Sequence, residues 1–130
     1  LMDGLMGFNS RGHLVPRLAE SFEVSPDLRQ YKFRMRGGVQ WSDGAAVEPD
    51  HIRIAIERAL LPKTGAKLSG LLKWIEGAEA FAAGKATSVS GIEIAGPEIR
   101  FKLTKPISFF EQVLALPVTY PLRKDVLDAN

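Results

Sequence analysis

The 130-residue sequence contains no cysteine, so it can form no disulfide and offers no thiolate chemistry. It has no run approaching the roughly 20 apolar residues of a membrane-spanning helix, and no charged segment followed by an apolar one as in a signal peptide. Histidine is scarce, with His13 and His51 the only two. These absences argue against a disulfide scaffold and leave few groups for metal binding or acid–base catalysis.

An excess of charge of one sign is also absent. Lys and Arg number 17 against 15 Asp and Glu, a formal net charge of +2. Such a near balance argues against the strongly basic surface that holds nucleic acid. With 45% hydrophobic and 25% charged residues, we expect residues 1–130 to form a single domain with one core. Because the sequence already reads as folded at Leu1, we expect this domain to be cut from a longer chain.

Two predicted hairpins dominate the pattern. From Gln30 to Arg36, apolar and basic residues alternate as in a strand with one buried face, and the Ala19 to Val24 stretch before it pairs through a turn at residues 25–27. This pairing is expected to set Glu23 near Lys32 or Arg34. The second hairpin is expected from Val89 to Ile94 and from Ile99 to Leu103.

Helices are expected between and after the hairpins. Pro49 and Asp50 suit a helix start, Ile52, Ala55, Ile56, Ala59 and Leu60 recur at helical spacing, and Pro62 marks the stop. Residues 68–84 are less regular, with an alanine-rich helical turn between Gly77 and Gly84. Ser108 is predicted to cap a helix carrying Phe109, Phe110, Val113 and Leu114 and closed by Pro117, and a further turn is expected at 123–129. This order favours an α+β fold with a mostly antiparallel sheet.

No catalytic constellation is visible. His13 and His51 lack metal-ligand spacing and are expected to be solvated or locally bonded, and no nucleophile motif accompanies a base. Glu48 and Asp50 are close in sequence but suit the dipole at a helix start. We therefore expect no catalytic residue and no metal site.

Two further strings have structural interpretations. The Trp41-Ser42-Asp43-Gly44 string is expected to be a turn with Trp41 in the core, and Trp74 is likewise assigned to the core. The basic run Lys32, Arg34 and Arg36 could suggest an RNA-binding sheet, but alternation places the neighbouring aromatic residues on the opposite face.

Several strings, in order, carry a resemblance: L-M-D-G-L-M-G from Leu1, L-V-P-R-L-A-E-S-F-E-V-S from Leu14, Y-K-F-R-M-R-G-G-V-Q-W-S-D-G from Tyr31, L-L-P-K-T-G from Leu60 and L-A-L-P-V-T-Y-P-L-R-K-D from Leu114. Together they resemble the extracellular solute-binding proteins of family 5, the oligopeptide-, dipeptide- and nickel-binding receptors of bacterial ABC importers. The resemblance covers essentially the whole chain.

The resemblance implies a subdomain inserted into the first lobe of a two-lobed receptor, with no catalysis and no cofactor. The implied partners are the rest of lobe I, lobe II, the ABC permease and a peptide or other small solute, with no nucleic acid. The implied location is periplasmic or extracellular, with a membrane anchor.

In the peptide receptors, the segment after Thr64 carries tyrosines that reach the ligand cleft. Here Leu68 and Leu71 stand at those positions and are the candidate ligand-binding residues, and Glu48 replaces the usual threonine cap. The alternative function is an autonomous protein-interaction module with an exposed apolar face.

Overall fold

A computed structural model describes residues 4–41, 43–61, 69–116 and 119–122. Its elements, in chain order, are the strands β1 (Met6–Phe8), β2 (Leu14–Pro16), β3 (Ala19–Val24) and β4 (Gln30–Met35), the helices α1 (Pro49–Leu60), η2 (Ser69–Leu72, a 3-10 helix) and α2 (Ala78–Ala82), the strands β5 (Ile92–Ala95) and β6 (Glu98–Lys102), and the helix α3 (Phe110–Val113).

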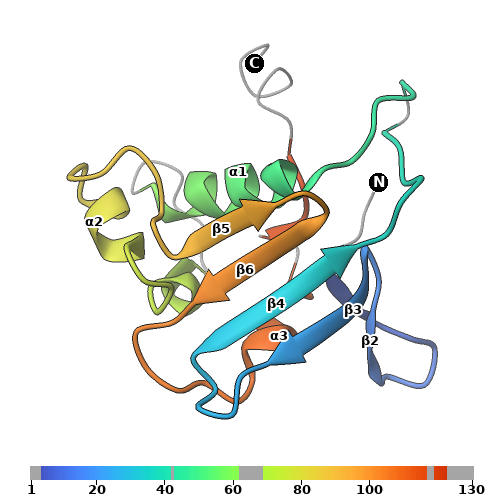
Figure 1. Cartoon of the computed structure of the whole chain (residues 1–130), viewed down its shortest axis with the longest axis horizontal. Helices are drawn as coiled ribbons and strands as arrows, with labels where there is room; N and C mark the ends of the chain where they lie inside the picture. Colours follow the sequence, from blue (N-terminus) through green and yellow to red (C-terminus); the bar gives the residue numbers. More distant parts are fainter. Residues whose placement is uncertain (1–3, 42, 62–68, 117–118, 123–130) are drawn as a thin grey trace.

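The central feature is a four-stranded antiparallel sheet of order β3-β4-β6-β5, with β1 and β2 forming a separate two-stranded ribbon. The two inner strands of the four-stranded sheet, β4 and β6, join the two predicted hairpins. Their pairing aligns Tyr31 with Phe101 and Phe33 with Ile99. In Figure 1, α1 and α3 lie behind the sheet, and its other face is turned to the viewer. The expected α+β fold with an antiparallel sheet is confirmed.

The core lies between the sheet and the helices. Alternation along β4 buries Tyr31, Phe33 and Met35 on one face, as the sequence predicts. Phe110 of α3 packs against the rings of Tyr31 and Phe101, at centroid distances of 5.2 and 5.4 Å. From α1, the predicted apolar stripe contributes the buried residues Ile52, Ala55, Ile56, Ala59 and Leu60. The aromatic rings therefore tie both hairpins to α3.

Both predicted hairpins are present. Glu23 forms the expected ion pair with Lys32, at 3.2 Å, whereas Arg34 pairs with Glu20. In the second hairpin the first arm begins at Ile92 and not at the expected Val89. The Val89 N–H donates instead to Glu57 Oε2 of α1, at 3.0 Å, which holds this residue outside the strand ladder.

The last helix departs from the prediction. Helix α3 begins at Phe110 with Phe109 in the N-cap position and no side-chain cap, so the expected cap by Ser108 is wrong. Leu114 is the C-cap of this one-turn helix. Residues 62, 117 and 123–129, to which the sequence assigned helix ends and a helical turn, lie outside the described residues.

Two glycines mark the ends of the helix in the irregular region before β5. Gly77 and Gly84 have φ values of 84° and 79°, a backbone region open to glycine, and α2 lies between them as expected. The β1–β2 ribbon, in contrast, was not predicted.

Candidate functional site

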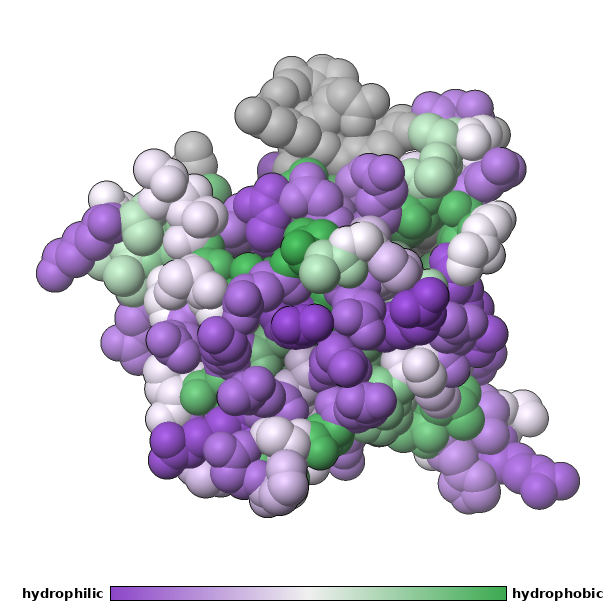
Figure 2. Space-filling view, viewed as in Figure 1, coloured by the Kyte–Doolittle hydropathy of each residue, from purple (hydrophilic) through white to green (hydrophobic). Residues whose placement is uncertain are grey.

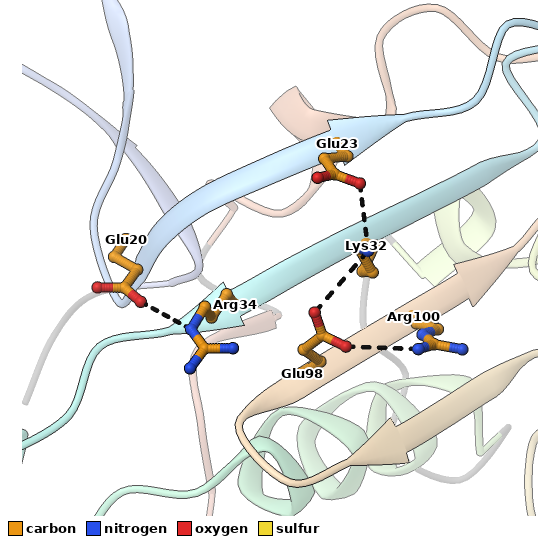
Figure 3. Close-up of polar contacts among 6 residues, drawn as sticks. All are labelled: Glu20, Glu23, Lys32, Arg34, Glu98 and Arg100. Carbon is orange, nitrogen blue, oxygen red and sulfur yellow. Dashed lines mark hydrogen bonds and ion pairs between the residues drawn. The ribbon is translucent and has the colours of Figure 1, made fainter.

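The outward face of the four-stranded sheet carries a network of alternating acidic and basic side chains, called the charge lattice below. Figure 3 shows Glu20 and Glu23 on β3, Lys32 and Arg34 on β4, and Glu98 and Arg100 on β6. The same alternation that buries the aromatic residues of β4 and β6 turns these side chains outward. Figure 2 shows this face as predominantly hydrophilic.

Each cation of this lattice has a glutamate partner. Lys32 Nζ lies 3.2 Å from Glu23 and 3.8 Å from Glu98, and Arg34 Nε lies 3.0 Å from Glu20. Arg100 Nη2 lies 3.4 Å from a Glu98 oxygen. We define the charge lattice as these ion pairs together with the pair between Lys102 and Glu93.

The Lys102–Glu93 pair shows the electrostatic effect most clearly. Lys102 Nζ lies 2.8 Å from Glu93 Oε1. The hydrogen bond from Lys102 and its positive charge lower the pKa of Glu93, and the same contact raises the pKa of Lys102. Both groups are thus held in their charged forms as a pair.

A hollow of 660 Å³ opens on this face, near the turn between β3 and β4. Its charged lining residues are Glu23, Lys32, Glu93, Arg100 and Lys102, all members of the charge lattice. Tyr31 and Phe33 are buried on the other face, so they cannot stack on bases. The paired cations and buried rings disfavour the RNA-binding interpretation.

The two histidines lie on different elements. His13 is exposed in the β1–β2 turn, where its backbone N–H donates to Asn9 Oδ1 at 3.0 Å. His51 lies in the first turn of α1, and its Nδ1 accepts from the Glu48 N–H at 3.0 Å and from Trp41 Nε1 at 3.3 Å. Both are locally bonded, as the sequence predicts.

His51 also explains how α1 begins without a threonine. Glu48 is the N-cap residue, and the acceptor that reaches back to its N–H is a histidine three residues on, in place of the usual Glu or Gln. Asp50, the other acid at this helix start, bonds Arg53 Nε at 2.7 Å. Within the described ranges, no group of three His, Asp or Glu side chains could hold a metal ion.

The Trp41-Ser42-Asp43-Gly44 string forms the expected turn in its described part. Trp41 is half-buried against the core, Asp43 Oδ1 accepts from the Ala45 N–H at 3.0 Å, and Gly44 has a φ of 90°. Ser42 lies outside the described residues. This string positions α1 through the contact between Trp41 and His51.

Trp74 is half-buried and packs against the core, in line with its predicted role. The rings of Trp74 and Phe109 form a T-shaped pair at a centroid distance of 6.2 Å, and Lys105 Nζ lies 4.1 Å from the centroid of the Trp74 ring. One side of the ring is therefore covered by a lysine of the chain itself.

Of the two candidate ligand-binding residues, the structure places one. Leu71 lies in η2, half-buried against the core, and Leu68 lies outside the described residues. Their role in ligand binding stays a prediction. Among the helices of the described residues, none has both the length and the apolar character needed to cross a bilayer.

Comparison with known proteins identifies the family of this chain. Residues 13–129 match the family described as "Bacterial extracellular solute-binding proteins, family 5 Middle". The chain is 31% identical over 131 residues to the probable deoxycholate-binding periplasmic protein YgiS of Escherichia coli, covering 98% of this chain and 24% of that protein. It is 30% identical to a dipeptide-binding protein of Lactococcus lactis, covering 97% of this chain and 23% of that protein.

Solved structures of solute-binding proteins superpose on nearly the whole chain. The substrate-binding domain of an oligopeptide ABC transporter from Bacillus anthracis superposes with a TM-score of 0.89 at 28% identity, over 98% of this chain and 25% of that one. The OppA protein of Haemophilus influenzae in complex with the peptide RPPGFSPFR superposes with a TM-score of 0.89 at 27% identity, over 99% of this chain and 26% of that one.

The chain thus spans about a quarter of the length of its relatives. Nothing in these comparisons favours the alternative of an autonomous interaction module. The match covers most of the chain in sequence and nearly all of it in structure. The chain therefore belongs to family 5 of the bacterial extracellular solute-binding proteins.

Proposed function

We propose that this chain is a supporting subdomain in the substrate-binding component of a bacterial ABC importer for peptides or similar small solutes. The observation that carries the proposal is the superposition of nearly the whole chain on one quarter of a receptor solved with a bound nonapeptide. The subdomain supports the first lobe and contributes few of the ligand contacts.

The ligand class follows from the relatives. Their names include dipeptide-, oligopeptide-, glutathione- and deoxycholate-binding proteins. This range favours a peptide or a solute of similar size and does not select one. The proposed location is outside the cytoplasmic membrane, as part of a membrane-anchored receptor that delivers its solute to a permease.

The geometry of the two ends of the described chain supports an inserted subdomain. A Cβ atom placed on Gly4 would lie 2.5 Å from the Leu114 carbonyl oxygen and 3.4 Å from Tyr120 Cδ1, so the first and last described segments are in contact. The last described segment is also fixed to α1, since the Leu122 N–H donates to the His51 carbonyl at 2.9 Å. An insertion between two points of one lobe needs its entry and exit close together, and the contact between the segments of Gly4 and Tyr120 supports the proposal.

Leu68 and Leu71 are the residues of this chain that we propose to approach the ligand. Leu71 lies near the end of η2, just before Lys73, which is exposed, and Trp74, which is half-buried. An aliphatic side chain there offers an apolar contact without the hydroxyl that a tyrosine would supply. The proposed contribution to affinity is correspondingly small.

We also propose that the subdomain performs no catalysis. The histidine side chains are far apart in the chain and His51 is occupied by two hydrogen-bond donors, while Asp50 is bonded to Arg53. General acid–base catalysis needs such groups to converge on one substrate atom.

The test compares the 130-residue chain with the full-length receptor by isothermal titration calorimetry. The probes are a dipeptide, the nonapeptide RPPGFSPFR, glutathione and deoxycholate. We expect the full-length receptor to bind at least one probe and the isolated chain to bind none with a micromolar Kd. Micromolar binding by the isolated chain, or cleavage of a peptide detected by mass spectrometry, would contradict the proposal.

A further inference from the structure

His51 is the residue at which three described segments of the chain meet. Its ring Nδ1 accepts hydrogen bonds from the Glu48 N–H at 3.0 Å and from Trp41 Nε1 at 3.3 Å. Its backbone carbonyl accepts from the Leu122 N–H at 2.9 Å. The first turn of α1, the loop that carries Trp41 and the last described segment are thus all bonded to this one histidine.

The loop that carries Trp41 is closed by its own backbone hydrogen bonds. The Trp41 N–H donates to the Ala45 carbonyl at 2.7 Å. We define the Trp41 loop as residues 39–47, described apart from residue 42. In Figure 1 this loop leaves the end of β4 and reaches away from the sheet before the chain enters α1. The rings of Trp41 and His51, with centroids 5.5 Å apart, join it to the first turn of the helix.

Both hydrogen bonds at the ring need Nδ1 without a proton. A neutral imidazole has one N–H and one acceptor nitrogen, whereas an imidazolium has an N–H at both positions and accepts nothing. Since Nδ1 faces two N–H donors, the hydrogen-bond network assigns the proton of the neutral ring to Nε2. His51 is half-buried, so water reaches it. The side-chain contacts of His51 therefore exist only in its neutral form.

The charged groups around His51 are already engaged or lie outside ion-pair distance. The charged or titratable side chains of the described segments that meet there are Glu48, Asp50 and Arg53 of the start of α1, Asp43 of the Trp41 loop and Tyr120 of the last segment. Asp50 bonds Arg53, and Asp43 Oδ1 accepts from the Ala45 N–H at 3.0 Å. Among the described residues, no ion pair involves His51.

We propose that His51 makes the packing of the Trp41 loop against α1 depend on pH. When Nδ1 takes up a proton from water, it becomes a donor that faces the N–H groups of Glu48 and Trp41, and both groups lose their acceptor. The imidazolium also adds a positive charge to the first turn of α1, where the helix dipole disfavours a cation. Because histidine changes its charge between pH 5 and 8, the loop is held at neutral pH and released from α1 in mild acid.

The inference goes beyond the proposed function and does not depend on it, because it concerns contacts within this chain. Under the proposed location outside the cytoplasmic membrane, the chain meets the pH of its surroundings directly. Mild acid then loosens the Trp41 loop and the helix start whose carbonyl holds Leu122.

The test follows the 130-residue chain by proton–nitrogen correlation NMR from pH 8 to pH 5. The reporters are the Trp41 indole N–H and the Glu48 amide N–H, and the ring signals of His51 give its protonation state at each pH. The indole N–H of Trp74, whose ring pairs with Phe109, is the reference in the same spectra.

Two variants separate His51 from the other titratable groups. His51→Gln replaces the ring by an amide that can accept from the Glu48 N–H and does not titrate. His13→Gln is the matched control, because it makes the same change at the other histidine, which is exposed in the β1–β2 turn.

We expect the Trp41 and Glu48 signals to shift with the same midpoint as the His51 ring. Exchange of the Trp41 indole proton with water, corrected for the intrinsic effect of pH, should be about tenfold faster when His51 is protonated, the value of about one lost hydrogen bond. His13→Gln should behave as the unmodified chain does. In His51→Gln both signals should stay constant.

Trp41 and Glu48 signals that stay constant while the His51 ring titrates would overturn the proposal. So would the same shifts in His51→Gln, which would assign them to the carboxylates at the helix start, or a His51 ring that stays neutral down to pH 5. A Trp74 signal that changes with the same midpoint would mean that the whole fold is lost, which also overturns it. If His51→Gln does not fold, the unmodified chain still decides through these signals.

Discussion

Gly91 is predicted to be a position at which the fold tolerates a side chain poorly. It lies where the loop before β5 meets β6 and the segment between η2 and α2. Its N–H donates to the Glu76 carbonyl at 2.8 Å, its carbonyl accepts from the Lys102 N–H at 2.8 Å, and the Glu76 N–H donates to the Lys102 carbonyl at 2.7 Å. Three backbone segments therefore close on one residue that has no side chain.

The substitution Gly91→Ala places a Cβ atom 2.5 Å from the Glu76 carbonyl oxygen and 2.8 Å from the Lys102 carbonyl oxygen. A carbon–oxygen contact is normally about 3.3 Å or longer, so the backbone must separate by several tenths of an ångström. Overpacking of this kind costs about 1–3 kcal/mol, and weakening one of the three hydrogen bonds adds about 1 kcal/mol. We expect the free energy of unfolding to fall by about 2–4 kcal/mol.

The assay is urea unfolding of the 130-residue chain, followed by circular dichroism. The matched control is Gly37→Ala, because a Cβ atom there would meet nothing within 4 Å and its φ lies outside the left-handed region. That change should be neutral or stabilising by about 0.4–1 kcal/mol. Free energies of unfolding for Gly91→Ala and Gly37→Ala within about 0.5 kcal/mol of each other would refute the reasoning.

Three further predictions concern single side chains. Burial, and then the nearby Glu111 carboxylate, raise the pKa of Tyr31, so its contribution to stability is complete below the ordinary tyrosine pKa of about 10 and is lost as pH rises through the raised value. Urea midpoints measured from pH 9 to 11 should fall more steeply for the unmodified chain than for Tyr31→Phe, and parallel curves would contradict this. His51→Ala should lower the free energy of unfolding by about 1–2 kcal/mol, because two N–H donors lose their acceptor. His51→Gln should lower it by less, since glutamine can accept from the Glu48 N–H. Equal losses for the two variants in urea titrations would contradict the capping role of His51. In the full-length receptor, Leu71→Ala should weaken ligand binding by about threefold, the value of part of an apolar contact, while Leu14→Ala should not; calorimetry showing equal Kd values for both variants would remove Leu71 from the site.

The sequence could predict those helices and strands whose apolar residues recur with the period of the element and form one buried face. Alternation from Gln30 to Met35 and the spacing in α1 each follow from one face packing against the core, and the structure confirms both. The family resemblance was also available from ordered strings, and the comparisons confirm it. These features depend on the order and spacing of residues along the chain, which a single sequence contains.

Features set by distant contacts could not be predicted. Lys32 meets Glu98 only because β4 pairs with β6, and Val89 leaves the strand because Glu57 of α1 accepts its N–H. The cap at His51 could not be predicted because histidine replaces the Glu or Gln of the usual pattern. Asn9 and Gly12 did offer a turn signal for the β1–β2 ribbon, but its three-residue strands are too short to show a clear alternation.

The position of charge, more than its sum, separates the surfaces of this chain. A net charge of +2 excludes little, yet the glutamates of the sheet lie opposite its cations, so that Lys32, Arg34 and Lys102 are each paired. A protein that docked on the sheet would have to replace ion pairs already formed, so it would gain little from its own charges. The charged face of the sheet is therefore a poor docking surface for a charged partner.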